Sequence, residues 1–175
     1  MSLFSIKKQR KKDVMNSGKR FEQNFKNSIP KDIFLYRFKD GSSAWGGNEK
    51  VRFQATNICD YLMFDGSYLY LLEMKSTKAK SLPLANIKEH QINDLVKANK
   101  YANVVCGFLI EFSKVNEVYF LEIDKFQEFM KTTERKSIPI DYCSDKGIKI
   151  EVTKLKTNSR YNVEKMIDDI VKEVI

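Results

Sequence analysis

Residues 58–78, ICDYLMFDGSYLYLLEMKSTK, decide the fold, because two apolar, aromatic-rich runs flank a single Asp-Gly pair. An Asp-Gly pair between such runs is the strongest short-range signal for a β-hairpin. We therefore expect two antiparallel strands joined at Asp65-Gly66. With those two residues as the loop, Asp60 faces Leu71 across the hairpin.

Three charged side chains of this hairpin are expected on one face of the sheet. Glu73 lies two residues beyond Leu71, so it shares the face of Asp60 and is its diagonal neighbour. Lys75 follows on the same face, because side chains alternate along a strand. Diagonal neighbours lie roughly 7–8 Å apart. A four-residue turn keeps this arrangement, whereas a three-residue turn with a bulge can break it.

Two carboxylates that lean together across this gap can bind one small cation. Carboxylate oxygens suit Mg²⁺, and also Mn²⁺, so Asp60 and Glu73 are candidate metal ligands. A metal there polarises a phosphate oxygen and activates a water, while Lys75 orients that water or neutralises added charge. The alternative is a salt-bridged solvent face, because Glu-x-Lys is common by chance. The apolar surroundings favour the metal site, since charge in such strands needs a compensating role.

Two more polar residues are candidates for the same site. Glu22 lies in a helix predicted from Ser17 to about residue 27, and Gln91 lies in a helix predicted from about residue 86. Either side chain can reach the metal directly or through water. The alternatives are a solvated helix surface for Glu22 and a satisfied polar pair for His90-Gln91 at the helix–sheet boundary.

The remaining elements favour a mixed α/β fold, with a central sheet flanked by helices. Further strands are expected at 33–38, 104–112, 117–123 and 148–152, and further helices at 124–130 and 163–174. We expect a single domain over residues 14–175, preceded by a flexible basic arm at residues 1–13. The glycine-rich segment at about residues 39–56 is expected to protrude between two strands.

Charge and composition point to a polyanionic partner. The chain has 31 Lys and Arg against 23 Asp and Glu, a net charge of +8, which favours nucleic acid over a membrane surface. No apolar run reaches the about 18 residues needed to cross a bilayer. Three cysteines without metal-ligand spacing indicate reduced thiols in a cytoplasmic protein. The single histidine excludes a metal site built on two or three imidazoles.

Six short motifs carry a resemblance to a known family. They are GKRFE at 18–22, CDY at 59–61, EMKSTK at 73–78, HQI at 90–92, GFLIEF at 107–112 and RKSIP at 135–139. Asp60 with Glu73-Met74-Lys75 resembles the core of the PD-(D/E)xK nucleases, although Cys59 replaces the usual proline. In this order the motifs resemble the RecU family of Holliday junction resolvases, including phage-borne relatives, over about residues 16–150.

The resemblance implies a homodimeric, Mg²⁺-dependent endonuclease of restriction-endonuclease-like fold. Such an enzyme nicks two strands of a four-way DNA junction symmetrically during recombination and repair, and contact with a RecA-type recombinase is implied as well. By matching position, Asp60 and Glu73 are metal ligands, Lys75 is the catalytic lysine, Gln91 is an active-site polar residue that contacts the metal, and Glu22 is a secondary catalytic candidate. Residues 39–56 resemble the stalk of such enzymes.

Basic residues are expected to neutralise DNA phosphates around the site. They are Lys11, Lys12, Lys19, Arg20, Arg37, Lys50, Arg52, Lys78, Lys80, Arg135 and Lys136. Each phosphate contact adds about 0.9 to the salt dependence of binding. Two other functions stay open: a restriction-type endonuclease that cuts duplex DNA, and a non-catalytic junction-binding protein. The intact charges of Asp60, Glu73 and Lys75 count against the second.

Overall fold

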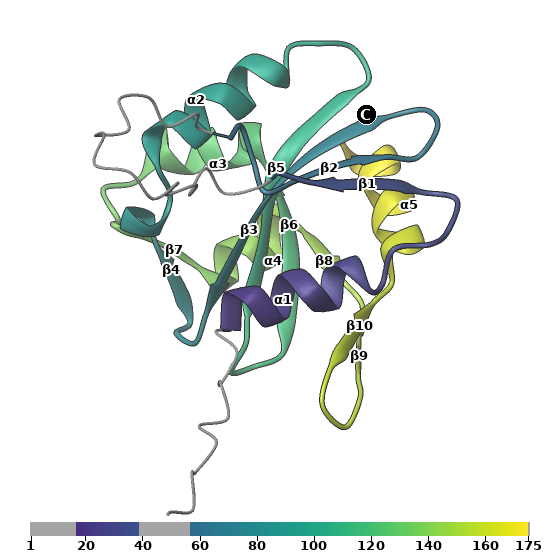
Figure 1. Ribbon diagram of the computed structural model, residues 1–175. Helices are drawn as coiled ribbons and strands as arrows, with labels where there is room; N and C mark the ends of the chain where they lie inside the picture. The colour runs from purple at the N-terminus through teal and green to yellow at the C-terminus, as the bar shows by residue number, and fades with distance from the viewer. Residues whose placement is uncertain (1–16, 39–56, 175) are drawn as a thin grey trace, which may run out of the picture.

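The computed structural model describes residues 17–38 and 57–174, which form a mixed six-stranded sheet with helices on both faces (Figure 1). In spatial order the strands are β1 (Phe34–Arg37), β2 (Tyr61–Phe64), β3 (Leu69–Thr77), β5 (Val104–Phe112), β6 (Glu117–Glu122) and β8 (Ile148–Ile150). Neighbouring strands are antiparallel except β3 and β5, which are parallel and joined by a helical crossover. The predicted mixed α/β class is confirmed.

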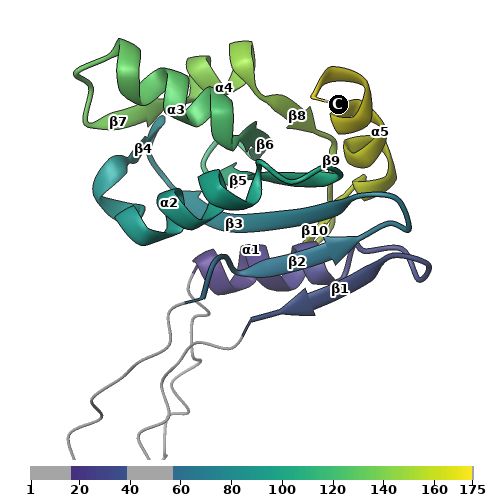
Figure 2. The same ribbon diagram turned by 90° about the horizontal axis from the view of Figure 1, so that it is seen from above.

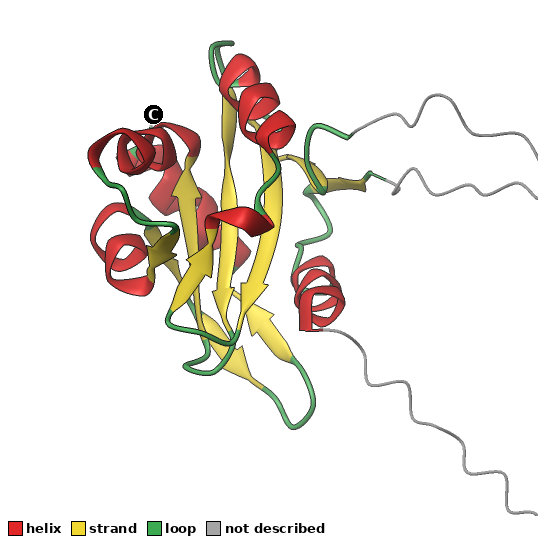
Figure 3. Cartoon of the chain, turned by 90° about the vertical axis from the view of Figure 1, so that its left-hand side faces the viewer, coloured by secondary structure: helices red, strands yellow, loops and turns green. Residues whose placement is uncertain are grey.

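Within residues 17–38 and 57–174, five helices cover the two faces of this sheet. They are α1 (Ser17–Lys26), α2 (Glu89–Ala98), α3 (Ile123–Thr132), α4 (Ile140–Lys146) and α5 (Val163–Glu173). Figure 2 shows α2, α3 and α4 on one side of the sheet and α5 on the other, and Figure 3 shows the strands as the central layer. Side-chain alternation makes two cores: Leu72 of β3 packs with α1 and α5, whereas Leu71 packs with α2, α3 and α4.

The β2–β3 hairpin is confirmed, but its predicted two-residue loop is wrong. Phe64 pairs with Leu69, so four residues connect the strands. The Asp65 carboxylate widens the turn, because its Oδ1 accepts hydrogen bonds from the backbone N–H groups of Ser67 (2.7 Å) and Tyr68 (2.8 Å). The register therefore moves by two residues, which keeps every side chain on its predicted face.

Two small ladders were not predicted. β4 (Ser81–Pro83) pairs with β7 (Ser137–Pro139), which lies within the RKSIP motif. β9 (Val152–Lys154) pairs with β10 (Ser159–Tyr161), so the strand expected at 148–152 is divided between the central sheet and this hairpin. A single 3₁₀ turn, η1 (Leu84–Asn86), precedes α2, which therefore begins later than expected.

Several predictions concern parts of the chain outside the described residues. These are the basic arm at 1–13 and the stalk at about 39–56. Within residues 17–38 and 57–174, no helix has the length and apolar character needed to cross a bilayer.

Candidate active site

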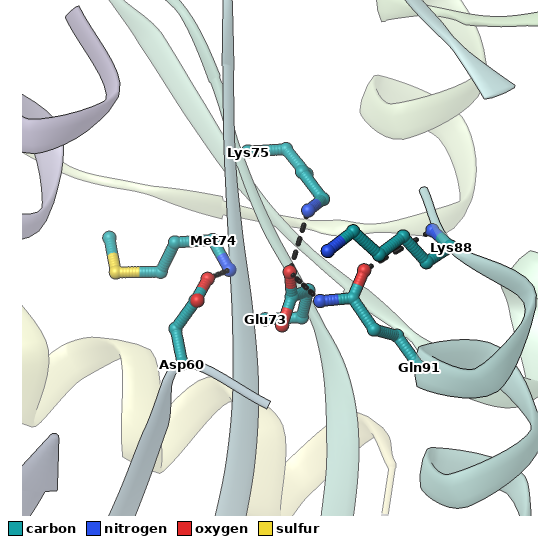
Figure 4. Close-up of polar contacts among 6 residues, drawn as sticks. All are labelled: Asp60, Glu73, Met74, Lys75, Lys88 and Gln91. Carbon is teal, nitrogen blue, oxygen red and sulfur yellow. Dashed lines mark hydrogen bonds and ion pairs between the residues drawn. The ribbon is translucent and has the colours of Figure 1, made fainter. Parts of the chain in front are cut away.

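Glu73 is a buried carboxylate in the middle of β3, and its side chain faces α2. Its Oε1 accepts hydrogen bonds from Lys75 Nζ and from Gln91 Nε2, both at 2.6 Å (Figure 4). Its Oε2 is buried and has no hydrogen-bond partner among the described residues. A buried polar atom without a partner is uncommon in folded proteins, and a bound ion or water would satisfy it.

Asp60 lies where β2 stops pairing with β3. The ladder ends at the pair Tyr61–Leu72, and the Asp60 Oδ2 accepts a hydrogen bond from the N–H of Met74 at 2.7 Å. The Asp60 backbone carbonyl accepts a second bond from Phe38 N–H at 3.0 Å. Because the turn has four residues, Asp60 lies across from Glu73 rather than from Leu71. The two hydrogen bonds hold it in this position.

The Asp60 and Glu73 carboxylates repel each other, which makes their ionised forms less favourable. Burial, assisted by the negative charge of Asp60, raises the pKa of Glu73 from 4.5 to about 7, against the opposing effect of Lys75. Burial also raises the pKa of Asp60, although the Met74 N–H and the Lys75 ammonium oppose the rise. A bound cation relieves this repulsion, because it stabilises the ionised form of both groups.

The helix that follows orients Gln91. Its side-chain oxygen accepts a hydrogen bond from the backbone N–H of Lys88 at 3.2 Å, so the amide nitrogen is directed at Glu73. Figure 4 also shows the Lys88 side chain pointing toward the group formed by Glu73 and Lys75. Lys88 was missed by sequence analysis, and its position three residues before Gln91 at a helix start is the signal that locates it.

Glu22 reaches the edge of the site but is engaged by another residue. Its Oε2 accepts hydrogen bonds from two nitrogens of Arg37, Nε at 2.9 Å and a terminal nitrogen at 2.8 Å. The Glu22 charge contributes to the raised pKa of Asp60, which places the two side chains near each other. Arg37, predicted to contact DNA, therefore lies beside the carboxylate group.

The structure brings some of the predicted DNA-contacting residues together. The β4–β7 ladder joins their two segments: Lys80 O accepts from Ile140 N–H at 2.9 Å, and Lys136 O accepts from Leu84 N–H at 3.0 Å. Lys78 and Arg135 are exposed next to these segments. Lys19 and Arg20 are exposed on α1, which covers the other face of the sheet. Lys11, Lys12, Lys50 and Arg52 lie outside the described residues.

The raised pKa of Glu73 predicts a pH-dependent stability of the metal-free protein. The folded chain binds more protons than the unfolded chain between pH 4.5 and about 7, so stability falls as pH rises through this window. We expect the free energy of unfolding to fall by about 2 kcal/mol between about pH 5 and pH 8. Urea unfolding in a chelator measures it.

Glu73→Gln should lose most of this slope and exceed the wild type in stability at the higher pH, because the variant has no charge to bury. Glu164→Gln, on the exposed face of α5, is the matched control and should keep the wild-type slope. A wild-type slope in Glu73→Gln would show that another group carries the effect.

Comparisons with known proteins agree with the motifs. The family model described as RecU, Recombination protein U, matches residues 12–166. The chain is 32% identical over 174 residues to the SPbeta prophage-derived uncharacterized protein YotM of Bacillus subtilis, covering 90% of this chain and 88% of that protein. It is 28% identical over 130 residues to the Holliday junction resolvase RecU of Pediococcus pentosaceus, covering 72% of this chain and 63% of that protein.

The chain thus spans less than two thirds of the length of the Pediococcus resolvase. Among solved structures, the Holliday junction resolvase Hjc of Archaeoglobus fulgidus aligns with 67% of this chain and 83% of its own, with 14% identity and a TM-score of 0.44. The family-model match includes Asp60, Glu73, Lys75 and Gln91, and the prophage relative covers nine-tenths of the chain. Together these two findings show that this protein belongs to the RecU family, as its motifs predict.

Proposed function

We propose that this protein is a metal-dependent endonuclease that resolves four-way DNA junctions by paired nicks. Membership of the RecU family supports a nuclease function, and the Pediococcus relative is named a Holliday junction resolvase. The observation that carries the proposal is the placement of Asp60 beside buried Glu73 and next to Lys75, where β2 stops pairing with β3.

The carboxylate pair fits Mg²⁺. Glu73 offers a buried oxygen without a hydrogen-bond partner among the described residues, and Asp60 offers a second carboxylate beside it. The described residues bring no third His, Cys, Asp or Glu into the group, which suits Mg²⁺ because this ion usually keeps several waters and takes one or two carboxylates. Mn²⁺ accepts the same oxygen ligands. An ion held by Asp60 and Glu73 would supply Lewis-acid chemistry, polarising a phosphate oxygen and lowering the pKa of an attacking water.

The protein's own residues position the reacting groups. Lys75 donates one hydrogen bond to Glu73, and its ammonium group has two further N–H donors for a phosphate oxygen or a water. Only 17% of its side chain is exposed, so its charge acts in a setting that water screens weakly. Gln91 holds the Glu73 carboxylate in one orientation and becomes a direct metal ligand only if its amide oxygen leaves the Lys88 N–H.

Cleavage of a synthetic four-way junction tests the proposed activity. With Mg²⁺, the wild type should make paired symmetric nicks in an end-labelled junction and leave linear duplex of the same sequence uncut. Asp60→Asn should abolish the nicks and keep junction binding, since it removes a ligand charge and no phosphate contact. Lys75→Ala should slow nicking by about 10²–10³-fold. Asp168→Asn, exposed on α5, is the matched control and should nick like the wild type.

Each other outcome of this assay identifies a different function. Equal cutting of the duplex would favour the restriction-type endonuclease over the resolvase. Tight junction binding without nicks, with either Mg²⁺ or Mn²⁺, would favour the non-catalytic junction-binding protein. Loss of binding in Asp60→Asn would show that Asp60 has a structural role.

Thermal unfolding tests the metal assignment separately from activity. Mg²⁺ should raise the unfolding temperature of the wild type, because a ligand at about 100 times its Kd adds about 2.7 kcal/mol of stability. Asp60→Asn should lose most of this increase, whereas Asp168→Asn should keep it. An equal increase in all three proteins would contradict a metal site at Asp60 and Glu73.

A homodimer would present two such sites to opposed strands of a junction, and β1 supplies a surface for it. β1 is an edge strand of the sheet, and two of its aromatic side chains are exposed, Phe34 at 58% and Tyr36 at 49%. Phe64, paired with Phe34 on β2, is 42% exposed. An exposed aromatic patch on an open edge strand is typical of an interface, and a twofold dimer makes it self-complementary.

Light scattering tests this interface. The wild type should be a dimer, and Phe34→Glu/Tyr36→Glu should be a folded monomer, because four carboxylates would meet across the twofold axis. Tyr101→Glu, at a side chain that is 71% exposed, is the control and should remain a dimer. A dimer of the double variant would place the interface elsewhere.

Two further expectations stay predictions. Contact with a RecA-type recombinase rests on the family resemblance. A cytoplasmic location rests on the cysteines, which are free and buried in the structure.

A further inference from the structure

A basic groove lies between α1 and the β9–β10 hairpin, which projects from the body of the fold in Figure 1. We use this name for the cavity of about 230 Å³ whose walls are Arg20 and Asn24 of α1, hairpin residues 154–159, and Glu111, Ser113 and Asn116 at the end of β5 and in the turn after it. The hairpin has the sequence KLKTNSR at 154–160, with three cations and no acid. Its charge was not part of the DNA-binding set expected from the motifs.

The cations of this region form no ion pair within residues 17–38 and 57–174, although the charge of Arg20 opposes the raised pKa of Glu111. Neither Arg20 nor Lys154, Lys156 or Arg160 forms an ion pair there, and all four are exposed. By contrast, Lys149 on the adjacent β8 forms an ion pair with Glu117 at 3.2 Å. The positive charge of the hairpin is therefore available to a polyanion.

One acid lines the groove, and it belongs to the floor. Glu111 is only 8% exposed, and its carboxylate accepts a hydrogen bond from Ser76 Oγ at 2.6 Å. The lining contains this one acid and three cations. The cations are Arg20, Lys154 and Lys156, and all three are exposed at the rim. The rim therefore carries the excess of positive charge.

The lining also supplies neutral hydrogen-bond donors. Thr157 and Ser159 carry hydroxyl groups, and Asn158 carries an amide. Hydroxyl and amide side chains, together with Lys and Arg, are the groups that contact DNA phosphates in protein–DNA complexes. The groove thus combines charge and donors in one concave surface.

The groove and the candidate active site lie on opposite faces of the same strand end. Ser76, which holds Glu111, directly follows Lys75 on β3, and successive side chains point to opposite faces. Beyond Leu72, β3 pairs only with β5 among the described strands. A nucleic acid that crosses this edge can therefore contact both faces.

We propose that the basic groove binds two neighbouring phosphates of the DNA backbone outside the cleavage site, with Lys154 and Lys156 each contacting one of them and Arg20 on the opposite wall. The inference rests on the proposed function, because that function names DNA as the ligand. Phosphate contacts of this kind add affinity and fix orientation without reading sequence.

The salt dependence of DNA binding tests the groove. Lys154→Ala/Lys156→Ala removes two exposed cations with no partner in the described part of the chain. Binding to labelled junction and to linear duplex is measured by fluorescence anisotropy, in a chelator, between about 50 and 200 mM salt. The slope of log K against log salt should decrease by about 1.8, since each phosphate contact contributes about 0.9. Affinity at about 0.1 M salt should fall by at least tenfold.

The matched control is Lys131→Ala/Lys172→Ala. It removes the same charge from exposed positions on α3 and α5 and should keep the wild-type slope. Lys154→Glu/Lys156→Glu should weaken binding further than the alanine pair, and circular dichroism checks that each variant is folded. Equal slopes in the groove and control variants would overturn the groove as a phosphate site.

The binding measurement, combined with the nicking assay in Mg²⁺, separates this inference from the proposed function. Wild-type binding without any nick in Mg²⁺ would overturn the resolvase activity, while the slopes would still decide the groove. Absence of binding to both DNAs would overturn both. Normal nicking with unchanged slopes would overturn the groove alone.

Discussion

The hydrogen bond from the Met74 N–H to Asp60 Oδ2 is the contact on which the site depends. A backbone N–H inside a sheet needs a hydrogen-bond partner, and the β2–β3 ladder supplies none beyond the pair Tyr61–Leu72. Asp60 replaces the missing ladder bond with a carboxylate. The same bond therefore terminates the β2–β3 ladder without an unpaired donor and holds a negative charge beside Glu73. A structural requirement of the sheet and a chemical requirement of the site are met by one side chain.

The buried charge of Glu73 is unfavourable, and hydrogen bonds from its neighbours offset part of that cost. Glu73 is 1% exposed, and a buried charge is costly unless it is paired. Lys75 and Gln91 both donate to one oxygen, Oε1, and leave the other oxygen without a hydrogen bond in the described part of the chain. An apolar residue at this position would favour stability, so the buried charge supports the metal site that we propose. Trade-offs of this kind are expected where a protein acts on its ligand.

The sequence predicted the shared face of Asp60, Glu73 and Lys75 better than it predicted the length of the turn between their strands. Side-chain alternation has a period of two, so the change from a two-residue to a four-residue turn left Asp60, Glu73 and Lys75 on one face. The turn length depends on hydrogen bonds of Asp65 to two backbone groups, which a dipeptide signal does not encode. The long strands and four of the described helices were predicted because their patterns are local, whereas the seven-residue helix α4 was missed. The three-residue strands β4, β7, β9 and β10 were not, because each exists only through its partner.

The positions of the remaining site residues depend on long-range packing. Glu22 of α1 and Arg37 of β1 meet only in the folded chain, where they form an ion pair, and neither residue shows this in its local pattern. Gln91 is oriented by a backbone N–H, a donor that every residue except proline carries. The open end of β3 connects these observations. Where β2 stops pairing with β3, Glu73 and Lys75 face α2, while Ser76 and Glu111 face α1. This end of β3 therefore carries the carboxylate site on one face of the sheet and the basic groove on the other. A long polyanion suits such an edge better than an enclosed pocket, because it can extend across both faces at once.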